Sequence, residues 1–172
     1  IIEGEHEWRI HVANDFRILP KASENAEIVA TVKELLAKSK GVHTGCIIAP
    51  ASDSCFFSSL NLPPEIDTRD RHSLIYELEH HLPIDAESMA ADFSVPPAVV
   101  HETQTERGRS VSAIAVEVND WKPLADKLES EDIPVTNIIP SAILAIASLH
   151  EKHSFSGISS LMLGHGDHAD LI

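Results

Sequence analysis

The sequence predicts an α/β protein whose mixed sheets are flanked by helices, and three observations support this fold class. Short runs in which apolar and polar residues alternate are typical of half-buried strands. Longer segments carry apolar residues at helical spacing. The two kinds of segment alternate along the 172 residues, of which 43% are hydrophobic and can fill a sizeable core. Such alternation is expected of an α/β layered sheet.

The first part of the chain is predicted to contain two strands, a helix and a pair of strands. Asn14-Asp15 marks the turn between the first two strands. Gly41 is a suitable C-cap for the helix, and Pro50 with Ser52-Asp53 marks the turn between the paired strands. The expected ranges are 8–12 and 16–19 for the first strands, 23–40 for the helix, and 45–49 and 55–60 for the paired strands.

Prolines and a cap residue define the elements of the second part. Pro83 ends a helix, because proline supplies no amide hydrogen and disfavours helix in the residue before it. Pro96-Pro97 indicates that the strand over 91–95 is an edge strand or a loop. Asn119 is predicted to be the N-cap of a further helix. The remaining ranges are helices over 68–82 and 142–150, a hairpin tip at 103–108, strands over 111–116 and 133–139, and a final hairpin of 158–163 with 169–172.

The charge balance disfavours several classes of partner. The chain has 13 basic and 27 acidic residues, a formal net charge of -14. Such a surface repels phosphate backbones and anionic lipid, so nucleic acid and direct membrane-surface binding are disfavoured. No apolar run reaches the ~20 residues that span a bilayer, and no signal peptide is visible. Because the chain lacks an initiator Met and stops abruptly after Ala169–Ile172, we expect a fragment, and any membrane helix would lie outside it.

No motif of hydrolytic or phosphate chemistry occurs in the sequence. There is neither a G-x-S-x-G elbow nor a P-loop G-x-x-x-x-G-K-[ST]. Glu77 and Glu79 lie two apart on a predicted helix, so they face different directions and do not form an acid/base pair. Cys46 and Cys55 match no zinc spacing, and each is expected to pack as a small hydrophobe. A disulfide across the predicted strand pair is the less favoured alternative.

The eleven histidines raise the question of a metal site. The adjacent His80 and His81 would point about 100° apart on a helix, so they cannot easily bind one ion. A better candidate set is His165, Asp167 and His168, whose imidazole and carboxylate groups in a Gly-rich turn can bind Zn²⁺. A plain polar turn is the commoner structure for such a segment, and no metal is predicted.

Several motifs in the middle of the chain resemble a known family. The stretch Tyr76 to Asp85 contains the pattern E-x-E-x-x-L-P-ϕ-D, where ϕ is apolar, and Asp92 to Val95 follows as D-F-S-V. Leu60 to Pro63 and Asn119 to Ala145 carry further matches. In this order and spacing, the motifs resemble those of the PilM/GspL family, which are actin-like cytoplasmic proteins of type IV pilus and type II secretion machines.

Actin-like proteins hold a nucleotide between two glycine-containing hairpins, and both hairpins depart from the family pattern here. The first matches at Gly4, Trp8 and Arg9 but has Ile2 where the family carries an Asp. The second matches at Gly164 but has Met162 where the family carries the Asp that organises Mg²⁺-bound water. The resemblance therefore implies that Gly4 and Gly164 belong to degenerate nucleotide-binding loops. In this respect the chain is more similar to GspL than to the nucleotide-binding PilM.

The resemblance implies an actin-like (ribonuclease H-like) fold that is divided into two lobes. Residues 1–153 would form a first lobe with an inserted subdomain at about 65–135, and 154–172 would begin a truncated second lobe. The protein would be a non-enzymatic scaffold without a cofactor, in the cytoplasm at the inner membrane. Its expected partners are the secretion or pilus ATPase and inner-membrane platform proteins. A homodimer is compatible with the resemblance, although no residue demands it.

Two alternatives remain open from the sequence. The first is an active PilM-like protein that binds ATP with Mg²⁺ through the retained glycines. The second is a metal-dependent hydrolase of the ribonuclease H-like class. That chemistry needs several converging carboxylates, and only Asp92 and Glu117 are expected on strands.

Overall fold

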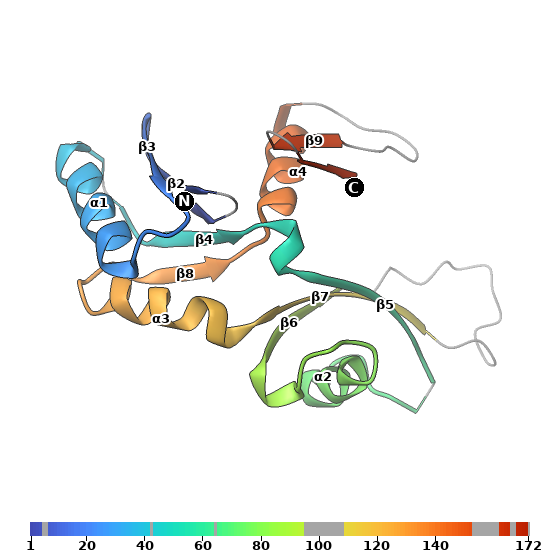
Figure 1. The fold of residues 1–172 in the computed structure, drawn as a ribbon. Coiled ribbons are helices and arrows are strands. Elements are labelled where there is room, and N and C mark those ends of the chain that lie inside the picture. Colours follow the sequence, from blue (N-terminus) through green and yellow to red (C-terminus); the bar gives the residue numbers. More distant parts are fainter. Residues whose placement is uncertain are drawn as a thin grey trace. The chain divides into compact units, whose positions relative to one another are not determined.

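The structure, a computed structural model, describes residues 1–4, 7–41, 43–63, 65–94, 109–152, 162–165 and 168–171. The chain forms two compact units (Figure 1). The first consists of Ile1–Asp53 with Lys122–Ile172, and the second of Ser54–Trp121. The second unit is therefore an insertion in the sequence of the first, and it begins and ends earlier than the expected range of about 65–135. The assignment of residues to actin-like lobes stays a prediction.

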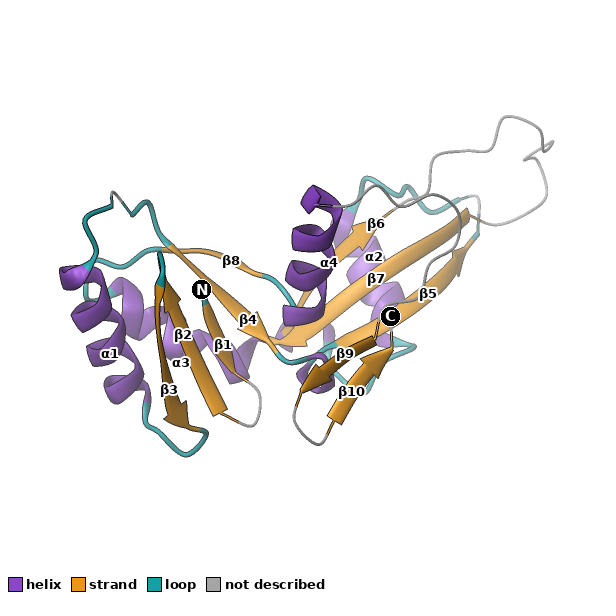
Figure 2. Cartoon of the chain, turned by 90° about the horizontal axis from the view of Figure 1, so that it is seen from above, coloured by secondary structure: helices purple, strands orange, loops and turns teal. Residues whose placement is uncertain are grey.

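A five-stranded mixed sheet is the framework of the first unit (Figure 2). Its strands are β1 (Ile2–Gly4), β2 (Glu7–Val12), β3 (Asp15–Pro20), β4 (Cys46–Pro50) and β8 (Val135–Ile138), in the order β3-β2-β1-β4-β8. β1, β2 and β3 are antiparallel neighbours, whereas β4 runs parallel to β1 and β8. The strands expected at 8–12, 16–19, 45–49 and 133–139 are thus confirmed.

Helix α1 (Asn25–Lys38) makes the crossover from β3 to the parallel strand β4. It packs against β2 and β3 through an apolar stripe, which consists of Ile28, Val29, Val32 and Leu35. An isolated helix of 14 residues is only marginally stable in water, so this burial is what holds α1 in place. The later helices α3 (Val118–Glu129) and α4 (Ser141–Lys152) are confirmed, as is the final hairpin of β9 (Met162–His165) and β10 (His168–Leu171).

The second unit contains an antiparallel sheet in the order β5-β7-β6 with one helix packed on it. Its elements are β5 (Phe56–Leu62), α2 (Arg71–Glu79), β6 (Met89–Ser94) and β7 (Arg109–Glu117). The core between helix and sheet is a buried cluster that includes Leu60, Leu62, Leu74, Leu78 and Val111. β6 is an edge strand, as the following prolines predicted. Those prolines and the expected hairpin tip at 103–108 lie outside the described residues.

The predicted pairing of the strands at 45–49 and 55–60 is wrong. β4 belongs to the five-stranded sheet and β5 to the three-stranded sheet, and a 3₁₀ turn (Ser52–Ser54) connects them. β4 has no edge available for β5, because β1 and β8 occupy both of its edges. Neither Cys46 nor Cys55 forms a disulfide, and Cys55 is buried as a small hydrophobe would be.

Two predicted helix boundaries also need correction. Helix α3 begins at Val118, directly after β7, so Asn119 lies within its first turn and is not its N-cap. Helix α2 ends at Glu79 rather than at Leu82. After Glu79 the backbone makes hydrogen bonds of the 3₁₀ type, between residues three apart. The amide of His81, for example, donates to the Leu78 carbonyl oxygen at 2.9 Å.

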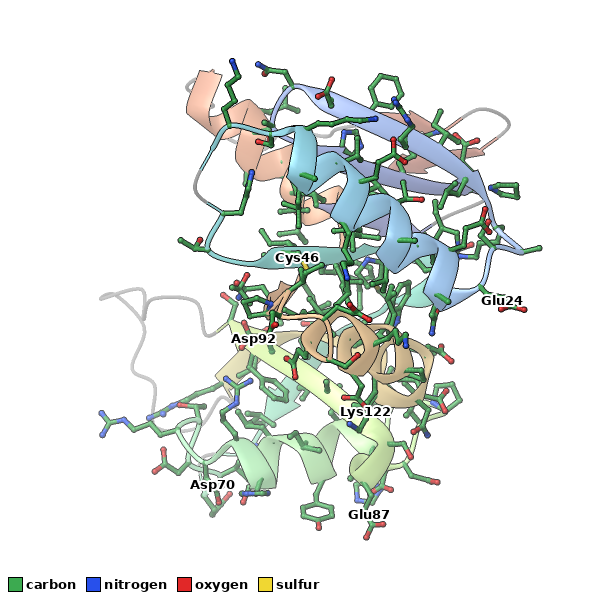
Figure 3. All side chains as sticks on the ribbon, turned by 90° about the vertical axis from the view of Figure 1, so that its left-hand side faces the viewer. Glu24, Cys46, Asp70, Glu87, Asp92 and Lys122 are labelled. Atoms are coloured by element: carbon green, nitrogen blue, oxygen red, sulfur yellow. The ribbon has the colours of Figure 1, made fainter. Side chains whose placement is uncertain are left out.

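Asp70 caps the start of α2 (Figure 3). Its Oδ1 accepts hydrogen bonds from the backbone amides of His72 at 3.1 Å and Ser73 at 3.4 Å, and its Oδ2 accepts from the Ser73 hydroxyl at 2.7 Å. These bonds satisfy amides that have no partner within the helix. The Ser73 hydroxyl, followed by the Ser73 amide, lowers the pKa of Asp70 below its usual range.

We expect Asp70→Ala to lower the stability of the second unit at neutral pH, because the first turn of α2 loses its cap. Since folding lowers the pKa of Asp70, the stabilisation is present above the unfolded pKa and is lost as the pH falls through the folded pKa. Thermal unfolding followed by circular dichroism should show a lower Tm for the variant at neutral pH and a smaller difference at about pH 3. Glu65→Ala, which removes an exposed carboxylate outside the helix, is the control. An unchanged Tm at neutral pH would contradict the capping role.

Candidate functional site

Gly4 stands where the first predicted nucleotide loop begins, at the end of β1. It is buried between Trp8 on β2 and Pro50 on β4, its register partners in the neighbouring strands. A Cβ atom at this position would lie 2.5 Å from Cζ3 of the Trp8 ring. Such a contact is too short for any side chain, so the packing of Trp8 alone requires a glycine here.

The Trp8 ring is held in this position by further contacts. Its Nε1 donates a hydrogen bond to the Lys21 carbonyl oxygen at 3.2 Å, and the Lys21 ammonium lies 5.0 Å from the ring centroid. Trp8 is also nearly buried, with 9% of its surface exposed. The ring therefore cannot move away from Gly4 without losing these contacts.

Polar and charged side chains of β1 and β2 lie close to one another on the face opposite Ile2 and Ile10. The Arg9 Nε lies 3.0 Å from Oε1 of Glu7, and the His11 Nε2 lies 3.4 Å from Oε2 of Glu3. Arg9 is the basic residue that matches the family's first loop. Because more than a third of each side chain in the Arg9–Glu7 pair is exposed, the pair is weak, but a phosphate would have to compete with Glu7 for the guanidinium.

Ile2 occupies the position at which the resemblance places a carboxylate. Its side chain is 1% exposed, and its register partners Ile10 on β2 and Ile48 on β4 are both 0% exposed. The three isoleucines form an apolar layer across three adjacent strands. This position therefore contributes to the core and presents no group that could bind Mg²⁺.

The second predicted loop is the hairpin of β9 and β10. Gly164 on β9 pairs with Ala169, and Met162 pairs with Leu171 at the open end of the hairpin. The candidate metal ligands His165 and His168 are register partners beside the turn, while Asp167 lies outside the described residues. Among the side chains that the structure describes, no group of three His, Cys, Asp or Glu is arranged to hold a metal ion.

The two strand-borne carboxylates of the hydrolase hypothesis do not converge. Asp92 pairs with Ile114, whereas Glu117 pairs with Met89, which precedes Asp92 by three residues in β6. Side chains alternate between the two faces of a strand, so an offset of three places the carboxylates on opposite faces of the sheet. Asp92 is moreover engaged by Arg71, whose Nη1 donates to its Oδ1 at 3.1 Å. The hypothesis of a two-metal hydrolase built on these residues is therefore wrong, because its two metals must lie about 4 Å apart and share carboxylates.

A cavity of about 280 Å³ lies in the first unit, away from the first predicted loop. Ile1 and Ile2 at the start of β1, Val12 at the end of β2 and Cys46 at the start of β4 contribute to its wall. Gly4 and Glu7, which flank the first predicted loop, lie at the other end of these strands. Burial raises the pKa of the Cys46 thiol, which keeps it protonated and unreactive at neutral pH.

The comparisons with known proteins found likeness in structure only. No protein-family model matches the chain, and neither does any curated protein. A chain of the PilM–PilN type IV pilus biogenesis complex superposes with a TM-score of 0.66 at 14% sequence identity, over 88% of this chain and 49% of that chain. The cytoplasmic domain of EpsL, an inner-membrane component of the type II secretion system of Vibrio cholerae, gives a TM-score of 0.49 at 14% identity, over 81% and 55% of the two chains.

The first of these likenesses shows that the chain shares the α/β fold of that chain of the PilM–PilN complex. The fold class predicted from the sequence is therefore confirmed. The chain spans about half the length of each of the two proteins. Within the described residues, no helix has the length and hydropathy needed to cross a membrane.

Sequence reasoning identified Gly4 but missed why it is a glycine. The signal was present, because Trp8 follows Gly4 at a distance that allows the two to face each other across a tight hairpin. It also missed Gly45, where a Cβ atom would lie 2.8 Å from the Pro134 carbonyl oxygen and 2.5 Å from Cγ2 of Thr136. Pro134 and Thr136 are distant from Gly45 in the sequence, so no local pattern predicts these two contacts of Gly45.

We expect Gly4→Ala to destabilise the first unit by about 1–3 kcal/mol, because the new methyl group overlaps the Trp8 ring. Denaturant unfolding followed by tryptophan fluorescence would measure the loss and report the displaced ring. Gly41→Ala is the matched control, since its Cβ would meet no atom closer than 3.6 Å. If both alanine variants unfold at the same denaturant concentration, Gly4 is not required by the packing of Trp8.

Proposed function

We propose that this protein is a non-enzymatic scaffold of a type II secretion or type IV pilus assembly platform. It recruits the secretion or pilus ATPase to the cytoplasmic face of the inner membrane and links it to platform proteins there. The observation that carries the proposal is the likeness to a chain of the PilM–PilN complex, which extends over 88% of this chain. The motif set in Tyr76 to Val95 supports the same group of proteins independently of the superposition.

We expect no catalysis because of the residues in and beside the first predicted loop. An active site for ATP needs a carboxylate near the metal-bound water, and the corresponding side chain here is the core residue Ile2. The Glu7 carboxylate forms a salt bridge with the Arg9 guanidinium, so a phosphate would have to displace it. Gly4 has a packing role with Trp8 that explains its presence without a nucleotide.

The acidic surface supports recruitment of a basic partner. The chain has a net charge of -14 in total, and complementary charge speeds and orients the association of two proteins. Residues 129–132 supply part of this charge after α3, and within this run Glu131 forms a salt bridge with Lys33 at 2.5 Å. The Lys33 ammonium, first through its hydrogen bond, lowers the pKa of Glu131, so this carboxylate stays ionised.

The second candidate function is an ATP-binding protein of the PilM type. Gly4 and Gly164 favour it, since glycine allows the backbone to approach a phosphate closely. The adenosine pocket would then have to come from sequence outside residues 1–172. The two functions differ in one measurable property, which is nucleotide affinity.

For the scaffold, we expect no heat of binding when ATP with Mg²⁺ is titrated into the longest soluble form of the protein. Circular dichroism and a cooperative thermal transition would establish that this form is folded. Micromolar affinity would overturn the proposal that the nucleotide site is degenerate and would favour the ATP-binding alternative. Glu7→Ala would then be expected to tighten binding, because it releases the Arg9 guanidinium.

We further expect the purified secretion or pilus ATPase of the same host to bind the immobilised protein. The affinity should fall as salt rises from low ionic strength to about 0.5 M, because an acidic surface and a basic partner attract through screened charges. Biolayer interferometry at several salt concentrations would measure this. Lack of binding at low ionic strength would contradict recruitment, whatever the outcome of the nucleotide titration.

A further inference from the structure

The cavity of about 280 Å³ in the first unit is a recess that five segments of the chain surround. Its wall contains the start of β1, the end of β2, helix α1, the residues just before β4 and the connection from α3 to β8. Most of the residues in the wall are apolar, and the polar ones are His11, His43, Cys46 and Asp132. A mostly apolar recess with a few polar groups is the usual composition of a site for a small molecule.

The walls of this cavity are tied to one another. The Cys46 amide donates a hydrogen bond to the Pro134 carbonyl oxygen at 2.8 Å, which joins β4 to the connection before β8. The Lys33 ammonium forms a salt bridge with Glu131, which joins α1 to the same connection. Cavities lower stability, but these ties prevent the chain from collapsing into the space. A ligand that fills it would supply the contacts that the lining atoms lack.

The volume of the cavity limits the size of its ligand. An engineered protein cavity of about 150 Å³ holds one benzene molecule. By proportion, 280 Å³ accommodates roughly ten non-hydrogen atoms, which corresponds to one ring with a short chain. A helix of a partner protein, about 10 Å across with its side chains, is too wide for this space. The cavity therefore fits a small molecule better than a structural element of another protein.

Carboxylates lie at the side where the cavity meets solvent. Asp132 in the wall is exposed, whereas Val32 and Ile133 in the same wall are buried. A second hollow adjoins the cavity, and its lining consists of Asp132, Pro134 and Glu129. The apolar interior is thus followed by a solvent-facing side that carries two acidic groups.

The charge of Glu129 is also felt inside the cavity. Burial is the main cause that raises the pKa of the Cys46 thiol, the Ile1 ammonium opposes this shift, and the Glu129 carboxylate adds to it. Burial in turn lowers the pKa of the Ile1 ammonium, which weakens the one positive charge acting on Cys46. A cation beside Asp132 and Glu129 is therefore attracted, whereas an anion is repelled.

We propose that this cavity is a binding site for a small amphipathic cation, which carries one ammonium group on an apolar body of roughly ten non-hydrogen atoms. The apolar body lies among Val32, Leu36 and Ile133. The ammonium group lies at the side of Asp132 and Glu129. Because the ligand contacts both α1 and the connection from α3 to β8, its binding stabilises the first unit. The binding is non-covalent and does not depend on the proposed scaffold function.

Titration with 4-phenylbutylammonium, followed by nitrogen–proton correlation NMR, tests the proposal. 4-Phenylbutan-1-ol and 4-phenylbutanoate are the matched neutral and anionic probes. The ammonium probe should bind with roughly millimolar affinity or tighter, as its size allows. The alcohol should bind more weakly and the carboxylate not at all. The largest shifts should occur at the amides of Leu36, Gly45 and Ile133, which lie in the wall.

A substitution on α1 tests whether the probe enters the cavity. Leu36 is half-buried in the wall, so Leu36→Trp places an indole in the space and should abolish binding of the ammonium probe and the alcohol. Ala37→Trp introduces the same side chain at the next position, which is exposed and does not line the cavity. This control should bind as the wild type does. Circular dichroism and thermal unfolding verify that each variant is folded.

A second variant tests the selection by charge. Asp132 has φ 60°, a left-handed conformation that Asn adopts readily, so Asp132→Asn removes the charge without straining the backbone. It should weaken binding of the ammonium probe about threefold and leave the alcohol unaffected. Glu65→Gln, at an exposed site in the second unit, is the control. The proposal is overturned by the absence of saturable shifts, by equal affinities for the ammonium probe and the alcohol, or by unchanged binding in Leu36→Trp.

Discussion

The structure of the first unit depends on one apolar layer, in which Ile2, Ile10 and Ile48 meet across β1, β2 and β4. All three side chains are essentially enclosed. The layer joins the antiparallel half of the sheet to the parallel half, because β1 is the strand that pairs with both. A carboxylate at Ile2 would be placed in this layer, where an unpaired charge is unfavourable by several kcal/mol. The packing of the sheet therefore requires an apolar side chain at position 2.

The same conflict between packing and chemistry appears at Gly4. A glycine in a nucleotide loop is usually explained by the close approach of phosphate, but here the Trp8 ring occupies the space. Gly4 is required by this packing, because a side chain there would overlap the Trp8 ring. A glycine at such a position is therefore weak evidence for a nucleotide.

The elements that could be predicted from the sequence are those whose signal is local. The stripe in α1, the alternation in β2 and the prolines after β6 each reflect contacts or constraints within a few residues. The predicted pairing of β4 with β5 was wrong because strand partners are not a local property. β4 pairs with β1 and β8, which lie far before and far after it in the sequence. At the candidate site the sequence singled out Gly4 and Gly164, whose role in nucleotide loops stays a prediction. The contact of Gly4 with Trp8 and the salt bridge of Arg9 with Glu7 required coordinates.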